Sequence, residues 1–201
     1  MSQFPVFETI AILDGIPQNL AFHQARMDNA IEELFKQTSV FNLAEIIQVP
    51  ERYQNGLVRC RIDYNQQDYH IIFSIYQKRE IKSYQAVYFD TLDYIFKYSN
   101  RENFDLIKIE KDEAIIIQNG KVTDCRVGNL LFLKNNIWYS PKDYLLKGTQ
   151  LSYLLSQNKI KLVEIKVEIC GTPNLFIMNC ACVPLPAPGA PKRIIFIKTS
   201  L

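Results

Sequence analysis

The chain has 201 residues, of which 48% are hydrophobic and 22% are charged. This composition excludes intrinsic disorder, because the apolar surface is large enough to offset the conformational entropy lost on folding. Lys and Arg number 23 and Asp and Glu number 21, which leaves a formal net charge of +2. A balance so close to neutral gives no electrostatic footprint for a nucleic acid or an anionic membrane, and we expect neither as a partner.

The sequence carries no pattern typical of a membrane span, a secretion signal or a metal centre. The longest apolar runs, such as residues 114–117 and 130–133, are far shorter than the ~20 residues of a spanning helix. Residues 1–5 lack the basic and apolar regions of a signal peptide. We therefore expect a cytoplasmic protein with no metal, although a zinc site is the alternative for its five reduced cysteines: Cys60, Cys125, Cys170, Cys180 and Cys182.

The first half of the chain predicts strands and one long helix. A strand over residues 7–13 ends at the turn-forming pair Asp14-Gly15. Asn19 is a suitable N-cap for a helix whose apolar residues form one stripe: Phe22, Ala30, Ile31, Leu34 and Phe35. The further β-rich runs predict a hairpin and a separate strand, at 57–64, 69–76 and 86–89.

The second half predicts two more hairpins. Asn119-Gly120 supplies the positive φ angles of a type I′ turn, and Asn135-Asn136 separates a second pair of apolar runs. A short helix is predicted at 149–156. The remaining predicted elements are strands at 114–117, 121–123, 130–133, 137–139, 160–169, 175–178 and 193–198, with an irregular Pro-rich loop at 184–191.

These elements predict an α+β protein with two lobes. The charged stretch 77–84 lies between two β-rich regions and is the expected boundary. We therefore expect a small N-terminal α+β lobe over residues 1–82 and a C-terminal lobe over residues 83–201. Periodicity and composition alone predict nothing more specific about function.

A set of short motifs, taken together in chain order, is more informative. Each motif is weak alone, but their order and spacing resemble the fold-type IV pyridoxal-5′-phosphate (PLP) enzymes, the class IV aminotransferases and aminodeoxychorismate lyases. The motifs are Phe7-Glu8-Thr9-Ile10, Asp14-Gly15, Asn19-Leu20, His23-Gln24-Ala25-Arg26, Lys97-Tyr98-Ser99-Asn100-Arg101, Val122-Thr123-Asp124-Cys125, Asn129-Leu130, Tyr139-Ser140-Pro141, Leu146-Lys147-Gly148-Thr149, Phe176-Ile177-Met178-Asn179 and Pro186.

The resemblance implies a fold like that of D-amino acid aminotransferase, with a small α/β sandwich lobe and a β-barrel-like lobe that carries the cofactor lysine. It also implies a homodimer that binds PLP. Lys97 matches the lysine that forms the internal aldimine and then acts as a general base. Asp124 matches the acidic residue that pairs with the pyridine nitrogen, where many members have Glu.

The same resemblance assigns the cofactor phosphate to several residues. Arg26 matches the phosphate-binding arginine, whose planar fork suits phosphate oxygens. Gly148, Thr149 and Gln150 match a turn at a helix start, where backbone N–H groups favour a dianion. Asn179 and Cys180 match the late loop that closes around the phosphate. Taken singly, each of these residues has a plainer explanation as a surface, cap or helix-edge residue.

The implied activity is transamination or elimination on an amino-acid-like substrate; the elimination would convert aminodeoxychorismate to p-aminobenzoate and pyruvate. The chain departs from the family at Leu151, where an arginine is usual, and in being shorter than typical members. A PLP-binding but inactive member, or a non-enzymatic small-ligand binding protein on the same fold, therefore stays open. Candidates to bind a substrate carboxylate are Arg59, Arg101 and Arg126.

Overall fold

The computed structural model describes residues 3–77, 80–166 and 175–178. Two compact units make up the chain: the first comprises Met1–Lys78 and Phe96–Arg101, and the second Arg79–Ile95 and Glu102–Leu201. This division differs from the predicted lobes, 1–82 and 83–201, at the segment that contains Lys97. Phe96 and Tyr98 pack against the core of the first unit, and the Phe7 N–H donates to the Lys97 carbonyl at 3.0 Å. These contacts are long-range and cannot be read from local sequence.

The first unit contains a four-stranded antiparallel sheet. Its spatial order is β2-β1-β3-β4, with β1 at Val6–Leu13, β2 at Ile16–Pro17, β3 at Leu57–Tyr64 and β4 at Tyr69–Ile75. The predicted first strand and the β3–β4 hairpin are confirmed, with Tyr64 opposite Tyr69. Asp14 and Gly15 adopt φ angles of 47° and 79°, the left-handed conformation that the predicted turn requires.

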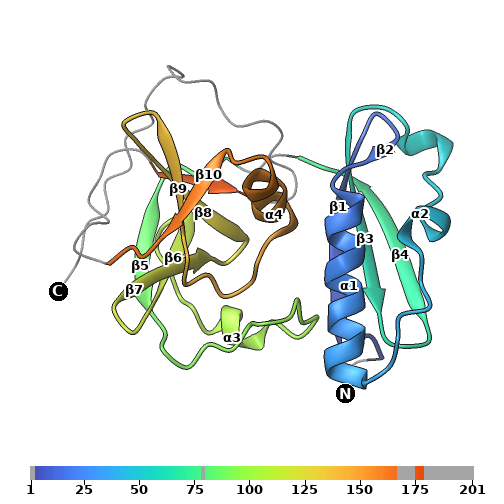
Figure 1. The fold of residues 1–201 in the computed structure, drawn as a ribbon, viewed down its shortest axis with the longest axis horizontal. Coiled ribbons are helices and arrows are strands. Elements are labelled where there is room, and N and C mark those ends of the chain that lie inside the picture. The colour runs from blue at the N-terminus through green and yellow to red at the C-terminus, as the bar shows by residue number, and fades with distance from the viewer. Residues whose placement is uncertain (1–2, 78–79, 167–174, 179–201) are drawn as a thin grey trace. The chain divides into compact units, whose positions relative to one another are not determined.

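The long predicted helix is α1, Leu20–Phe35, which lies along the sheet of the first unit (Figure 1). Asn19 is its N-cap as predicted, although its side chain makes no capping hydrogen bond. The buried stripe is His23, Met27, Ala30 and Ile31, so it is rotated from the predicted one, and Phe22 is only half-buried. Two short elements, α2 at Leu43–Ile46 and the 3₁₀ turn η1 at Glu51–Tyr53, have no counterpart in the predictions.

The second unit contains a seven-stranded mixed sheet. The path β10-β9-β8-β7-β6-β5 is antiparallel except for the parallel pairs β9–β10 and β5–β6, and β11 adds to β8. The strands are β5 Tyr84–Tyr88, β6 Glu113–Gln118, β7 Lys121–Cys125, β8 Gly128–Lys134, β9 Ile137–Pro141, β10 Ile160–Val163 and β11 Leu175–Met178. With two sheets and few helices, the predicted α+β class is confirmed.

Both hairpins predicted in the second half are present. Asn119 and Gly120 have φ angles of 50° and 72°, as a type I′ turn requires. The helix α4 spans Thr149–Ser156 as predicted, whereas the short α3, Glu102–Asp105, was not predicted. The strand predicted at 160–169 ends at Val163 in β10. The loop predicted at 184–191 and the strand predicted at 193–198 lie outside the described residues.

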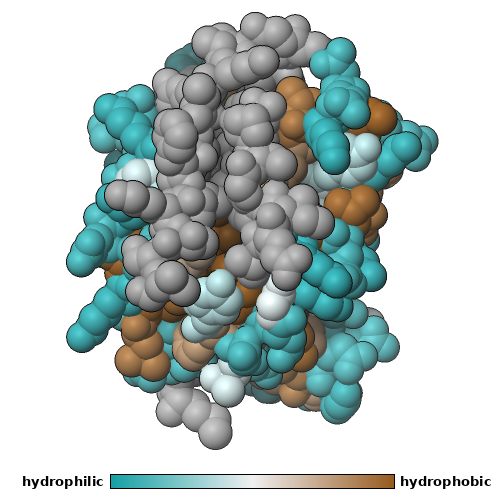
Figure 2. Space-filling model, turned by 90° about the vertical axis from the view of Figure 1, so that its left-hand side faces the viewer, coloured by the Kyte–Doolittle hydropathy of each residue, from teal (hydrophilic) through white to brown (hydrophobic). Residues whose placement is uncertain are grey.

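Helix α4 packs on the sheet through Leu151, which is fully buried and lies in one hydrophobic cluster with Trp138 and Ile160. Leu151 occupies the position where the family usually has an arginine, so at this site the chain replaces a charge with core packing. Figure 2 shows hydrophilic residues over most of the coloured surface in that view, with hydrophobic residues scattered among them. Among the described residues, no helix is long and apolar enough to cross a membrane.

Candidate functional site

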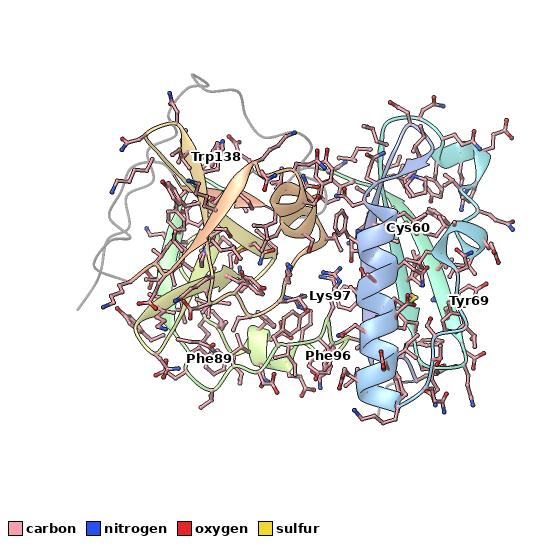
Figure 3. All side chains as sticks on the ribbon, in the orientation of Figure 1. Cys60, Tyr69, Phe89, Phe96, Lys97 and Trp138 are labelled. Carbon is pink, nitrogen blue, oxygen red and sulfur yellow. The ribbon has the colours of Figure 1, made fainter. Side chains whose placement is uncertain are left out.

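Lys97 lies in the first unit (Figure 3), in a segment whose backbone is hydrogen-bonded to β1. Its Nζ is 4.8 Å from the centroid of the Phe7 ring, and the guanidinium carbon of Arg61 is 3.9 Å from the same centroid. Arg61 is in turn paired with Asp63 through two hydrogen bonds. Lys97 is a half-buried residue, and its amine lies over an aromatic ring that a second cation also contacts.

A buried polar cluster joins β1 to α1 in the same unit. Glu8 is 0% exposed and accepts two hydrogen bonds from Arg26. Arg26 Nε donates to Oε1 at 2.8 Å, and Arg26 Nη2 donates to Oε2 at 2.6 Å. His23 Nδ1 lies 2.6 Å from the same Oε2. His23 and Arg26 share a helix face because they are three residues apart. The predicted phosphate-binding arginine is thus bound along one edge by a carboxylate.

The charges of this cluster follow from its burial and partners. Burial raises the pKa of Glu8, but the positive charge of Arg26 and the hydrogen bonds from His23 and Arg26 outweigh it and bring that pKa down to about 2. Burial also lowers the pKa of His23 from its usual value, against the opposing effect of Glu8. Glu8 is therefore an anion at neutral pH and His23 is neutral, so His23 donates its Nδ1 proton to the carboxylate.

We expect the stability of the protein to fall as the pH is lowered from neutral. The unfolded chain binds more protons than the folded one at both groups, first at His23 below about pH 6.5 and then at Glu8 between about 4.5 and 2. The Glu8 shift corresponds to roughly 3 kcal/mol of unfolding free energy, lost across that lower range. Urea unfolding at a series of pH values, compared with Glu8→Gln, checks this. An equally steep loss below pH 4.5 in the variant would contradict the assignment to Glu8.

Asp124 is a buried carboxylate at the end of β7 in the second unit, 5% exposed. Its Oδ1 accepts from Asn129 Nδ2 at 2.7 Å, and its Oδ2 accepts from the backbone N–H groups of Leu145 and Leu146 at 3.0 and 3.1 Å. Three N–H donors facing one side chain fix the orientation of the carboxylate.

Gly148 is the N-cap of α4 and is held by the same network. Its N–H donates to Asn129 Oδ1 at 3.0 Å, and a Cβ at residue 148 would lie 2.3 Å from that oxygen. Thr149 and Gln150, the first helical residues, are 3% and 6% exposed. The close approach requires glycine at 148, and it brings the start of the helix next to the Asp124–Asn129 pair.

Gly148→Ala is therefore expected to lower the unfolding free energy by about 1–3 kcal/mol, because Asn129 must move and break buried hydrogen bonds. Gly120→Ala is the matched control: that glycine has a positive φ but open space around its Cβ position, so only backbone strain of about 1 kcal/mol is expected. Urea unfolding of both variants measures the difference. Equal stability of wild type and Gly148→Ala would contradict the described contact.

The predicted site residues therefore fall into two groups. Lys97 and Arg26 belong to the first unit, and Asp124, Gly148, Thr149 and Gln150 to the second. Asn179 and Cys180 lie outside the described residues. Sequence reasoning did not assign a role to Glu8 or to the Leu145 and Leu146 amides. An acidic residue in an otherwise apolar strand is the signal that singles out Glu8; backbone donors leave no signal.

The arginines considered for a substrate carboxylate differ in their surroundings. Arg59 is exposed on β3 and its Nε donates to Ser74 Oγ at 3.2 Å. Arg101 is half-buried in the first unit. Arg126 Nε donates to the buried Glu113 at 2.8 Å in the second unit. Arg126 is thus part of an internal ion pair in the second unit.

Within the described residues, no group of three or more His, Cys, Asp or Glu side chains could hold a metal ion. The two cysteines among them, Cys60 and Cys125, are buried free thiols, and burial raises both pKa values, that of Cys60 to about 12. Neither is suited to act as a nucleophile.

The donor set has the chemistry that PLP requires. Lys97 offers an amine for its aldehyde, and Asp124 offers a buried carboxylate for its ring nitrogen. Arg26 and the helix start at 148–150 offer a guanidinium and backbone N–H groups for its phosphate. The absence of a Cβ at Gly148 keeps the Asn129–Asp124 pair intact at the helix start. The residues present therefore fit this cofactor.

Comparisons with known proteins show which proteins the chain is similar to. No protein-family model matches the chain. An uncharacterized protein of Haemophilus influenzae is 41% identical over 163 residues, which are 79% of this chain and 87% of that protein. The crystal structure of a proposed 4-amino-4-deoxychorismate lyase from Haemophilus somnus matches with a TM-score of 0.82 at 38% identity, over 90% of this chain and 98% of that one.

More distant structures share the fold. A hypothetical aminotransferase from Mycobacterium tuberculosis in its PLP-bound form has a TM-score of 0.70 at 13% identity, over 89% of this chain and 78% of that one. The branched-chain amino acid aminotransferase from Escherichia coli has a TM-score of 0.66 at 15% identity, over 89% and 73%. With the donor set above and the relative that is 38% identical along its length, the chain belongs to the fold-type IV PLP enzymes, the family of class IV aminotransferases and aminodeoxychorismate lyases.

Proposed function

We propose that the protein is a PLP-dependent enzyme that acts on an amino-acid-like substrate, with elimination from aminodeoxychorismate to give p-aminobenzoate and pyruvate as its reaction. The observation that carries the choice of lyase is the 38% identity, over 98% of its chain, with the proposed 4-amino-4-deoxychorismate lyase of Haemophilus somnus. The aminotransferase structures are 16% identical or less and support the fold alone. That match along nearly the whole relative also makes the short chain compatible with activity.

In this proposal Lys97 would attach the cofactor through Nζ, Arg26 and the start of α4 would bind its phosphate, and Asp124 would pair with its ring nitrogen. When bound, PLP supplies an aldehyde for the substrate amine and a protonated ring that accepts electrons. Asn129 and the Leu145 and Leu146 amides hold the Asp124 carboxylate in one orientation for that pairing.

Lys97 would have a second task as a general base. Its Nζ would remove the proton from the substrate carbon that bears the amine. The position of Nζ is restrained by the backbone hydrogen bond between residues 97 and 7 and by the Phe7 ring. Loss of the pyruvyl group needs no co-reactant, because p-aminobenzoate and pyruvate together contain all the atoms of aminodeoxychorismate. We also propose a cytoplasmic homodimer.

The test is a product assay on the PLP-loaded protein with aminodeoxychorismate. We expect p-aminobenzoate and pyruvate in equal amounts, at a rate that depends on the enzyme concentration. A parallel panel of L- and D-amino acids with keto acids tests transamination. Amino transfer without elimination would replace the lyase assignment with an aminotransferase one. Bound PLP with no reaction in either assay would indicate a cofactor-binding but inactive member.

A further inference from the structure

Glu8 is a fully buried carboxylate to which the proposed function gives no task. It lies on β1 between Phe7 and Thr9, and it is 0% exposed. A carboxylate in such a place is costly unless charge and hydrogen bonds compensate it. If residue 8 only packed α1 against the sheet, an apolar side chain would do so equally well. A buried charge at this cost within one small core therefore needs another explanation.

The geometry around Glu8 restrains one edge of the Arg26 guanidinium. Nε and Nη2 donate to the two carboxylate oxygens at 2.8 and 2.6 Å, the bidentate arrangement that fixes the plane of the group. An arginine side chain otherwise loses considerable rotamer entropy when a ligand orders it. The Arg26 side chain is 16% exposed, so it is held from inside the unit while its outer part reaches solvent.

His23 restrains the carboxylate in turn. It is 1% exposed, and its Nδ1 lies 2.6 Å from the Oε2 atom that also accepts Arg26 Nη2. The carboxylate is therefore held from two positions of α1, and it cannot rotate without losing a hydrogen bond. Because Glu8 neutralises part of the Arg26 charge, its contribution to anion binding must be orientation rather than attraction.

We propose that Glu8 is a positioning residue for the cofactor phosphate: by holding the Nε edge of Arg26, it directs the other N–H donors of the guanidinium to the phosphate. The inference rests on the proposed PLP binding and adds a residue that acts through Arg26. If Glu8 acts only through the phosphate, it has no effect on the binding of a cofactor that lacks a phosphate.

Pyridoxal, which has the aldehyde and ring of PLP but no phosphate, is the probe that isolates this effect. Dissociation constants of PLP and pyridoxal are measured by absorbance titration of the cofactor-free full chain. The variants are Glu8→Gln, Arg26→Met and the double variant, which removes both buried charges together. Glu113→Gln is the matched control, because it also breaks a buried Glu–Arg pair, with Arg126, in the second unit.

Glu8→Gln is expected to reduce the preference for PLP over pyridoxal by about tenfold or more, mainly through weaker PLP binding. Glu113→Gln is expected to leave the preference within about twofold of wild type, the scatter of such contributions. In the Arg26→Met background the Glu8 substitution should change nothing further. This last comparison uses two variants that both lack Arg26, so it does not require Glu8→Gln alone to fold.

An unchanged or increased preference for PLP in Glu8→Gln would overturn the inference and would indicate that Glu8 opposes the phosphate through its charge. A double variant that binds PLP much more weakly than Arg26→Met would overturn it too, because Glu8 would then act by another route. If the wild-type chain bound neither PLP nor pyridoxal, the proposed function itself would fail, and the two failures are thereby distinguished.

Discussion

Lys97→Ala is expected to abolish covalent attachment of PLP and to reduce turnover by about a thousandfold or more, because one amine both anchors the cofactor and moves the substrate proton. The substitution should leave the fold intact. The contacts that place residue 97 in the first unit are the backbone hydrogen bond to Phe7 and the packing of Phe96 and Tyr98, none of which needs the lysine side chain.

The visible absorbance spectrum and the product assay measure the two losses in one preparation. Lys36→Ala is a suitable control, since that lysine is 76% exposed and pairs only with Glu33 among the contacts described here. The control should keep both the chromophore and turnover. A Lys97→Ala protein that still forms the chromophore would show that another amine carries the cofactor, and the assignment of Lys97 would be wrong.

Asp124→Asn is expected to reduce turnover by about a hundredfold or more and to lower the unfolding free energy by about 1–3 kcal/mol. An amide has one acceptor oxygen, whereas the carboxylate accepts on both, from Asn129 on one side and from the Leu145 and Leu146 amides on the other. One set of donors must therefore face an NH₂ group. The neutral amide also cannot stabilise a protonated cofactor ring.

Asp112→Asn is the control for Asp124→Asn within the same unit. The Oδ2 atom of Asp112 accepts from the Lys82 and Ser83 amides and from Ser83 Oγ, and no cofactor contact is proposed for this residue. Its turnover and cofactor affinity should match wild type. Steady-state kinetics and urea unfolding of the pair give both comparisons. Wild-type turnover in Asp124→Asn would remove Asp124 from the proposed site.

The parts of the fold that could be predicted from the sequence are those fixed by local chemistry. Asn119-Gly120 predicts its hairpin because few other residues adopt the left-handed angles of that turn. Residues 149–156 predict α4 to the residue because a glycine precedes a compact apolar stripe. The sequence does not predict the four-residue helices α2 and α3, because they are too short to show a helical period.

The parts of the site that could not be predicted depend on long-range contacts. The family resemblance names Lys97 and Arg26, but it does not indicate that Lys97 packs with the first unit or that Arg26 is bound by Glu8, 18 residues earlier. Leu151 illustrates the same limit: its sequence position suggests a lost arginine, and only the packing of α4 on Trp138 and Ile160 shows the residue serving the core.

Borohydride reduction followed by peptide mass mapping tests the central claim most directly. The wild-type protein is mixed with PLP, reduced and digested, and the modified peptide is identified. The account predicts a yellow protein whose chromophore is fixed by reduction onto the peptide that contains Lys97, with the mass of one reduced cofactor. A colourless protein that takes up no PLP, or a modification on a peptide without Lys97, would contradict it.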